Sequence, residues 1–432
     1  VNPHPELIHE GIISPIWGSP GWEDLPRRAR SLVVNVSATT GEVLKRLSEE
    51  GARVRVEARL DERWRRCPIV VAEVRGNQDP DEFVLLHGHL DSWHYGAMDN
   101  GAANATVLEA VRVLVPGPRR RGLRVAFWSG HSHGRFAGSA WYADHWWFDL
   151  YRHCVAHVNA DSTGGRGATV LEDAPVMAET RALAAEVVRA IGGQELRGRR
   201  IGRFADQSFV GVGLPSVFGT FSEQDAADPE TRRGLSLFEH AEGRAAGLGW
   251  WWHTPEDTLD KVDEAFLVRD TRIYTGVLFR LLTEPALPLA YAATARELHD
   301  LLARYQAAAR GRLDLSAELA AAEALEAHAA ALRQALAAAA AAGDAPRLRA
   351  LNDVVMRLGR LLVPVNYTVR GPFEHDLGVA LPPLPGLAPA EALGTADPEA
   401  DEAKTLYVAL RRQANRVRFA LEEAIAAVRA VL

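Results

Sequence analysis

The stretch Val84-Leu85-Leu86-His87-Gly88-His89-Leu90-Asp91-Ser92 joins a short apolar run to a His-x-Asp motif. A run of roughly four to eight apolar residues bounded by polar or turn residues is typical of a strand buried on both faces. Open α/β sheets bind their ligands just beyond the carboxyl ends of such strands. We therefore expect a buried strand over 83–87 that delivers His89 and Asp91 to a functional site.

The segments around this strand alternate between strand-like and helix-like patterns. Strands are expected at 69–74, 83–87, 123–128, 154–160 and 216–218, and helices at 101–115, 138–148, 178–191 and 262–283. Strands that alternate with helices predict an α/β domain with a mainly parallel central sheet.

The region before this alternation has a weaker pattern. Residues 31–36 are rich in β-formers and residues 54–60 alternate apolar with charged side chains, so both are expected to be strands. Thr39 and Glu42 have the spacing of a capping box, which predicts a helix over 42–50.

The last third of the chain is rich in alanine and leucine. Residues 289–342 and 347–362 have helical periodicity, and Gly343-Asp344-Ala345-Pro346 separates them. Residues 363–400 are rich in Pro and Gly and are expected to form an ordered loop. Residues 401–431 are expected to form a last amphipathic helix.

Composition narrows the class of protein. The chain of 432 residues is longer than one typical domain, and its 47% hydrophobic and 24% charged residues are ordinary for a globular protein. A net charge of -7 gives no basic face for nucleic acid or an anionic membrane, so neither is expected as a partner. Cys67 and Cys154 cannot form a disulfide framework. No apolar run is long enough to span a bilayer and no signal peptide is visible at the start, which favours a cytoplasmic location.

Four further short segments, 99–101, 131–133, 161–162 and 253–258, carry His or Asp residues near expected strand ends. Asp99 opens a helix, where a carboxylate can bridge two cations about 3.5–4 Å apart or simply cap the helix. Asp161 ends a buried strand, where a free carboxylate is costly unless it is paired or binds metal. Each segment alone is a weak signal, since an isolated His-x-Asp is more often part of a solvated loop. Their joint order predicts a metal site.

In this order of motifs the chain resembles the M28 family of zinc peptidases, and specifically its glutamate carboxypeptidase II and transferrin receptor branch. The residues that carry the resemblance are His89-Leu90-Asp91-Ser92-Trp93, Asp99, Phe127-Trp128-Ser129-Gly130, Gly138-Ser139, Asn159-Ala160-Asp161-Ser162, Trp252-His253-Thr254 and Asp257-Thr258. The resemblance implies an α/β/α sandwich with a mainly parallel sheet.

The resemblance also implies a division of the chain into three parts. They are a partial protease-associated segment at 1–75, a catalytic domain at 76–285 and a helical, dimerisation-like domain at 286–432. Leu351-Asn352-Asp353, Pro364 and Pro372-Phe373 carry the likeness of the third part. A homodimer is therefore expected, although the C-terminal helices could instead cover the catalytic domain within one chain.

Carried over by position, the resemblance assigns five residues to the metal site. His89 and Asp161 become ligands of different metals, Asp99 bridges the two metals, and His253 completes the second set. Asp91 becomes the residue that orients His89. The expected cofactor is one or two zinc ions, and manganese or cobalt would suit the same ligands.

The third segment departs from the family. Where the family has a Glu-Glu pair that supplies the general base and a metal ligand, this chain has His131-Ser132-His133 in a loop one residue longer. His133 could replace the ligand, since neutral imidazole binds zinc well, and His131 could accept the proton. The alternatives are that both histidines are solvated loop residues in an inactive site, or that Glu239 or Glu242 is the base. Asp206 lies where the family often has a Ser-Asp-His element, but Gln207 replaces the His and no role is assigned.

The expected function is metal-dependent hydrolysis of amide bonds in peptides or acyl-amino acids, of the aminopeptidase or carboxypeptidase kind. The alternative is an inactive homologue that only binds a partner, as the transferrin receptor does. A helical oligomerisation protein with an α/β scaffold is a third possibility. Retention of His89, Asp99, Asp161 and His253 together favours the enzyme, because a pure binding protein has no need of them.

Overall fold

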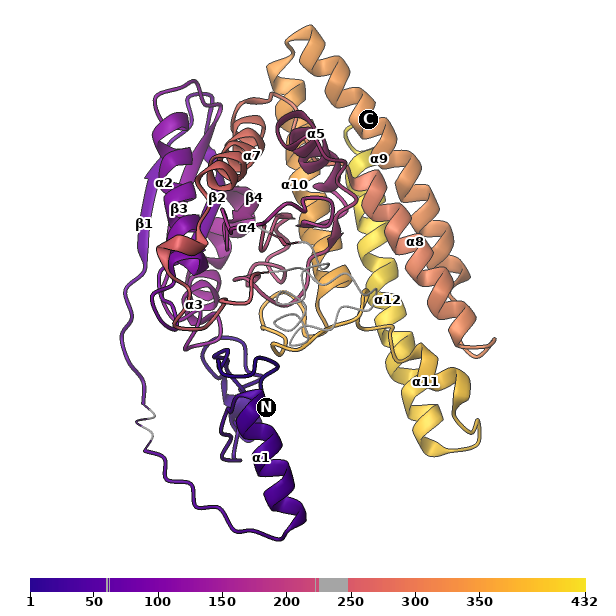
Figure 1. The fold of residues 1–432 in the computed structure, drawn as a ribbon. Helices are drawn as coiled ribbons and strands as arrows, with labels where there is room; N and C mark the ends of the chain where they lie inside the picture. The colour runs from indigo at the N-terminus through magenta and orange to yellow at the C-terminus, as the bar shows by residue number, and fades with distance from the viewer. Residues whose placement is uncertain (60, 62, 222, 225–247) are drawn as a thin grey trace.

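The computed structural model describes residues 1–59, 61, 63–221, 223–224 and 248–432, whose arrangement Figure 1 shows. Within these residues seven strands form one sheet in the order β1-β3-β2-β4-β7-β5-β6. The strands are β1 (Val70–Val74), β2 (Asp79–His89), β3 (Arg121–Trp128), β4 (Cys154–Asn159), β5 (Pro175–Val176), β6 (Arg199–Arg200) and β7 (Ser216–Val217). The pairs β1–β3 and β5–β7 are antiparallel and the others are parallel. The predicted α/β class with a mainly parallel sheet is confirmed.

Helices cover both faces of this sheet. They are α2 (Ala103–Leu114), α3 (Ala137–His145), α4 (Trp147–His153), α5 (Arg181–Gly192) and α7 (Glu264–Thr283). Successive side chains of a strand point to opposite faces. In β2, Phe83 and Leu85 share a core with α3 and α4, whereas Val84 and Leu86 share one with α2, α5 and α7. The continuous apolar sequence of β2 therefore reflects burial between two helical layers.

The C-terminal part consists of helices that pack against this sandwich (Figure 1). They are α8 (Tyr291–Ala308), α9 (Ser316–Ala342), α10 (Ala345–Tyr367), α11 (Ala390–Thr395) and α12 (Asp401–Arg429). Gly343, with φ +67°, ends α9, and the Asp344 side chain accepts the Arg347 N–H at the start of α10. From α10 the buried Arg360 donates to the carbonyl oxygens of Tyr151 and Gly213 at 2.7 and 2.9 Å. This guanidinium ties the helices to the α/β sandwich.

The N-terminal expectations were partly wrong. The residues predicted as strands at 31–36 form no strand, and neither do the described residues of 54–60. Side chains there are exposed, 67% in the case of Val54, so their apolar positions have no second layer to cover them. Helix α1 (Ala38–Glu49) begins four residues earlier than predicted, because Ser37 rather than Thr39 is its cap and accepts the Thr40 N–H.

Two helical segments also differ from the prediction. The single helix expected at 138–148 is two helices, α3 and α4, divided at Trp146. A π-helical turn, η2 (Ala97–Ala102), precedes α2, and Asp99 and Asn100 within it have non-helical backbone angles. Short 3-10 turns, η1 (Trp22–Arg27) and η3 (Leu259–Lys261), complete the described elements. The η2 irregularity is the one that matters, because it carries Asp99 into the site.

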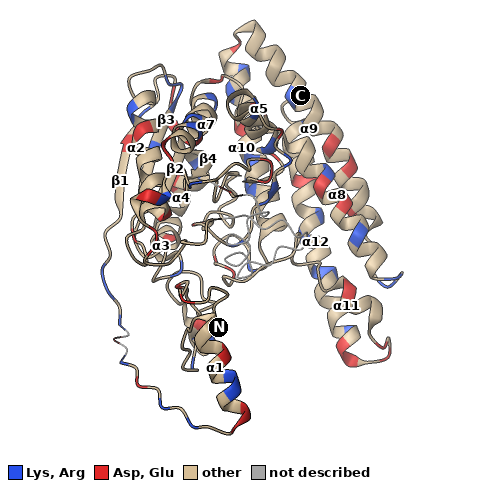
Figure 2. Cartoon of the chain, viewed as in Figure 1, with Lys and Arg blue, Asp and Glu red and all other residues tan. Residues whose placement is uncertain are grey.

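The surface charge is mixed. Figure 2 shows both acidic and basic residues on α8, α9 and α12. In the described part of the chain, no helix has both the length and the apolar character that a membrane crossing requires.

Candidate metal centre

Four of the predicted ligands come together at the carboxyl ends of the central strands. His89 is the last residue of β2, and Asp161 follows the neighbouring strand β4, in which Asn159 pairs with His87. Asp99 comes from the η2 turn and His253 from the loop before η3. Because β2 and β4 are parallel neighbours, their ends present His89 and Asp161 side by side.

The ligand atoms face one another around Asp99. His89 Nε2 lies 3.0 Å from Asp99 Oδ1 and 3.8 Å from Asp161 Oδ1. His253 Nε2 lies 3.0 Å from the other oxygen, Asp99 Oδ2. His89 and Asp161, which were expected to bind different metals, are therefore close enough to share one. Asp99 lies between that pair and His253, as expected of a bridging carboxylate.

Burial and missing partners at these atoms fit a metal ion. His89 and Asp99 are only 1% and 5% exposed. Although they face each other, His89 Nε2 and Asp99 Oδ1 are both enclosed without a hydrogen bond in the described structure. Buried polar atoms rarely lack a partner, and imidazole nitrogen and carboxylate oxygen are the donors that zinc prefers. The donor set therefore suits zinc.

In both His89 and His253, Nδ1 is bound to the backbone and Nε2 faces Asp99. His89 Nδ1 donates to the backbone carbonyl of Asp91 at 2.7 Å, and His253 Nδ1 donates to that of Glu10 at 2.8 Å. The bond of His89 fixes the tautomer in which its Nε2 carries a lone pair for a metal ion. Asp91 thus orients His89 through its main chain. Its carboxylate instead accepts the backbone N–H groups of His131 and Ser132, at 3.1 and 2.8 Å.

His131 lies beside His89. Their rings are stacked with centroids 3.6 Å apart, and Phe136 meets the His131 ring edge-on at 4.7 Å. His131 Nδ1 lies 2.6 Å from Asp206 Oδ2. Nitrogen or oxygen atoms of His89, His131 and Asp161 all fall within 4.8 Å of one another. His131 is therefore within reach of an ion on His89 and Asp161, or of a water bound to that ion.

His133, the expected replacement ligand, lies apart from this group. It is exposed, its Nε2 is 3.4 Å from the carbonyl oxygen of Ser92, and its ring packs edge-on against Trp93. The physical reason is the path of the loop, in which Arg135 and Phe136 have positive φ and Asp91 binds the backbone at His131. The other expected bases, Glu239 and Glu242, lie outside the described residues.

Three residues that support the site were given no role in the sequence analysis. The Asp257 carboxylate accepts the N–H groups of Met98 and Asp99 at 2.9 and 3.0 Å. Burial raises the pKa of Asp257 to about 6, an effect that these two backbone bonds partly offset. Asn100 donates to the carbonyl of Ala160 at 3.1 Å. Asp257 was visible within the His253 motif, and Asn100 beside Asp99, but neither pattern indicated what the side chain would bind.

Asp206 is the third such residue. It is buried, and besides His131 it accepts a hydrogen bond of 2.7 Å from Ser139 Oγ. Burial alone would raise the pKa of Asp206, but the charge and hydrogen bond of His131 outweigh burial and lower it. A charged carboxylate behind His131 is the arrangement that fixes an imidazole for proton transfer. The Gln in place of the family's His concealed this role.

Comparisons with known proteins agree with this geometry. Residues 70–275 match the model of the peptidase family M28. The matched segment spans most of the α/β domain. Aminopeptidase NAALADL1 of Rattus norvegicus is 26% identical over 413 residues, which cover 88% of this chain and 55% of the relative. A probable glutamate carboxypeptidase, VP8 of Zea mays, is 24% identical over 56% of this chain and 34% of its own length. The predicted likeness to the M28 peptidases is confirmed.

Solved structures give weaker matches. A zinc aminopeptidase from Bacillus subtilis aligns with 50% of this chain and 50% of its own, at 21% identity and a TM-score of 0.40. A glutaminyl cyclase from an Acidobacteriales bacterium covers 50% of this chain and 73% of its own, at 17% identity and a TM-score of 0.39. The chain spans 34% of the length of the maize relative and 55% of the length of the rat relative.

Proposed function

We propose that this protein hydrolyses amide bonds in peptides or acyl-amino acids with a single zinc ion held by His89, Asp99 and Asp161. The observation that carries the proposal is the convergence of two carboxylate oxygens, Asp99 Oδ1 from η2 and Asp161 Oδ1 from the end of β4, on the enclosed Nε2 of His89 at the end of β2. Catalytic zinc sites use three protein ligands and keep one position for water or substrate. The match of residues 70–275 to family M28 supports peptides as the substrate class.

The two oxygens of Asp99 have different numbers of possible ligands beside them, and this difference favours one ion over two. On the far side the described residues supply His253 Nε2 and Asp99 Oδ2, a pair of ligands. His133, the residue expected to complete that pair, is exposed and bonded to Ser92. Two protein ligands are fewer than zinc sites in proteins use. The proposed ion therefore lies on the His89 side, and His253, when both of its ring nitrogens are protonated, orients Asp99 by donating from Nε2.

His131 and Asp206 are proposed to move the proton. When bound, zinc polarises the substrate carbonyl and lowers the pKa of a water molecule to about 7. His131 Nδ1 is engaged by Asp206, which leaves Nε2 as the proton acceptor for the attacking water. The Asp206 carboxylate stabilises the imidazolium that forms. His131 then returns the proton to the leaving nitrogen, so the pair replaces the Glu base of the family.

The test separates the two histidines of the third segment. Hydrolysis of a panel of fluorogenic aminoacyl amides and N-acyl-amino acids is measured for the wild type, His131→Ala and the matched control His133→Ala. Loss of the base should lower kcat by about 10²- to 10⁴-fold in His131→Ala, with zinc content unchanged, and His133→Ala should resemble the wild type. No hydrolysis by zinc-loaded wild type across the panel would favour the inactive, partner-binding alternative.

The division into parts at 1–75, 76–285 and 286–432 and the homodimer are also proposed. The likeness of α8 to α12 to a dimerisation domain supports the dimer, and the packing of α10 on the sandwich supports the alternative of cover within one chain. Light scattering during size-exclusion chromatography decides between them. A mass of twice 47.1 kDa indicates a dimer, and 47.1 kDa indicates a monomer.

A further inference from the structure

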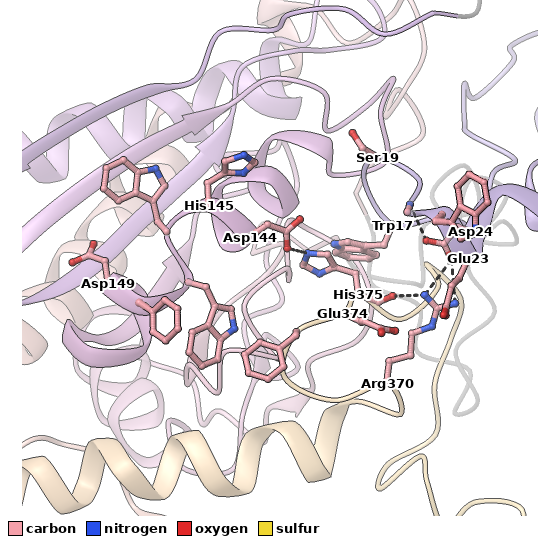
Figure 3. Close-up of a pocket in the computed structure, with 16 residues that line it drawn as sticks. Trp17, Ser19, Glu23, Asp24, Asp144, His145, Asp149, Arg370, Glu374 and His375 are labelled. Atoms are coloured by element: carbon pink, nitrogen blue, oxygen red, sulfur yellow. Dashed lines mark hydrogen bonds and ion pairs between the residues drawn. The ribbon is translucent and has the colours of Figure 1, made fainter.

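A cavity of about 780 Å³ lies outside the set of metal-centre residues (Figure 3). Three segments form it: the N-terminal residues 17–24, the junction of α3 and α4, and the loop 370–375. Its volume is typical of pockets that bind small molecules. None of the proposed zinc ligands, His131 or Asp206 lines it, so the proposed hydrolysis leaves its purpose open.

Aromatic rings make up much of the wall. The aromatic residues that line the cavity are Trp17, Trp22, Trp146, Trp147, Phe148 and Phe373. Trp22, Phe148 and Phe373 are 87%, 64% and 71% exposed. Large exposed apolar side chains gathered in one place are uncommon on a protein surface and mark binding sites. Trp147 and Phe373 lie with their ring centroids 4.9 Å apart, so the wall has an ordered part.

Trp17 is different from the other rings because it is buried. It is 3% exposed, stacks on Phe136 at 4.1 Å, and has the Arg203 guanidinium 3.8 Å from its ring centroid. Its Nε1 donates to Ser208 Oγ at 2.8 Å. The buried Trp17 is thus a fixed wall for the exposed rings.

The charged residues of the lining are mainly acidic. The carboxylates are Glu23, Asp24, Asp144, Asp149 and Glu374, against the single guanidinium of Arg370. Figure 3 shows Asp144 beside His375, and Arg370 near Asp24. Asp24 is paired with Arg370 at 3.1 Å and Asp144 with His375 at 3.0 Å. Within the described residues the side chains of Glu23 and Glu374 make no hydrogen bond or ion pair, which leaves negative charge at the cavity.

We propose that this cavity binds small organic cations of the quaternary ammonium type. The faces of aromatic rings attract cations through their quadrupole, and tryptophan is the strongest of them. A quaternary ammonium group has no N–H to satisfy, so a wall of rings with nearby carboxylates suits it better than a set of hydrogen-bond acceptors would. Glu23 and Glu374 supply the balancing charge. The site is distinct from the zinc site and does not depend on hydrolysis.

The test compares choline with 3,3-dimethyl-1-butanol, in which a neutral carbon replaces the charged nitrogen. Isothermal titration calorimetry of the full chain should give saturable binding of choline, with a dissociation constant of roughly 1 mM or lower. The neutral analogue should bind at least about tenfold more weakly. Equal affinities for the two compounds, or no binding of choline, would overturn the proposal.

Variants locate the binding. Trp22→Ala removes an exposed ring and Glu374→Gln removes one uncompensated charge, so neither change disturbs the core. Each should weaken choline binding by roughly three- to tenfold. Trp64→Ala, at an exposed tryptophan outside the cavity, is the matched control and should bind as the wild type does. Unchanged affinity in both cavity variants would mean that choline binds elsewhere and would contradict the assignment.

Discussion

The two oxygens of Asp99 face different surroundings, and the difference defines the site. Oδ1 faces His89, which in turn lies near Asp161 and His131. Oδ2 faces His253. Both histidines are fixed by a backbone carbonyl on Nδ1, at 2.7 and 2.8 Å, so the two sides are equally well oriented. Within the described residues they differ in the number of nearby ligand atoms, and for this reason the proposed ion is assigned to the His89 side.

The largest expected effect is a loss of zinc that differs between substitutions on the two sides of Asp99. Asp161→Ala should remove bound zinc at stoichiometric concentrations, because two protein ligands remain on the His89 side. His253→Ala should retain zinc, with an affinity reduced by about 10- to 100-fold as Asp99 loses its orienting partner. Competition with a fluorescent zinc chelator measures both. Equal losses of zinc affinity in Asp161→Ala and His253→Ala would contradict the assignment of the ion to the His89 side of Asp99.

The next effect concerns the residue behind His131. In Asp206→Asn the amide can turn an N–H toward His131 Nδ1 and favour the wrong tautomer, so kcat should fall by about 10³- to 10⁴-fold. Zinc affinity should not change. Ser139→Ala, which removes a single hydrogen bond to Asp206, is the milder control and should cost less than about tenfold. If Asp206→Asn also lost zinc, His131 would be a ligand rather than the base.

A smaller effect is expected at Asp257. In Asp257→Asn one of the N–H groups of Met98 and Asp99 loses its acceptor, since an amide offers one oxygen. The η2 turn should then hold Asp99 less firmly, and zinc affinity should fall by about 10- to 100-fold. Glu256→Gln, at the adjacent acid, is the control. Zinc affinity that is unchanged in Asp257→Asn would mean that the turn holds Asp99 without this carboxylate.

Glu179 is a buried carboxylate outside the metal centre, and its surroundings differ from those of Asp99. Glu179, like Asp99, is buried with one oxygen unpartnered in the described structure. Histidines face Asp99 and their contacts outweigh burial, which lowers its pKa. At Glu179 burial dominates over the hydrogen bond from Thr294 and raises the pKa to about 7. A buried acid therefore needs cationic or metal partners to stay charged at neutral pH.

Because burial raises the pKa of Glu179, the free energy of unfolding should depend on pH. Between the unfolded pKa of Glu179, near 4.5, and about 7, the folded state binds more protons than the unfolded state. The free energy of unfolding should therefore decrease as pH rises through this window, by up to about 3 kcal/mol. Glu179→Gln should flatten the decrease. Urea unfolding at several pH values measures it, and equal slopes in wild type and variant would show that Glu179 does not titrate there.

The same contrast between regions explains what the sequence could predict. His89 and Asp161 follow buried strands that the sequence marks clearly, whereas Asp99 and His253 were found from the order of the motifs and the family resemblance. The strands expected at 31–36 and 54–60 were wrong, because alternation predicts a strand only where a partner strand and a second layer exist. The break at Trp146 had no Gly or Pro to mark it.

Residues 131–133 show a second limit of prediction from sequence. Whether His131 or His133 enters the site depends on the backbone path of the loop, where Arg135 and Phe136 adopt positive φ. It also depends on the Asp91 carboxylate, which binds two N–H groups of that loop. Residue type alone cannot indicate such a path, since both side chains are imidazoles. Likewise Asp206 is 75 positions from His131, and only the fold brings them together.

The most direct test of the account is anomalous diffraction at the zinc edge from crystals of the zinc-loaded protein. The account predicts one peak per chain, within bonding distance of His89 Nε2 and the carboxylates of Asp99 and Asp161, with His131 close by. Two peaks, or a single peak between Asp99 and His253, would contradict the assignment of one ion to the His89 side.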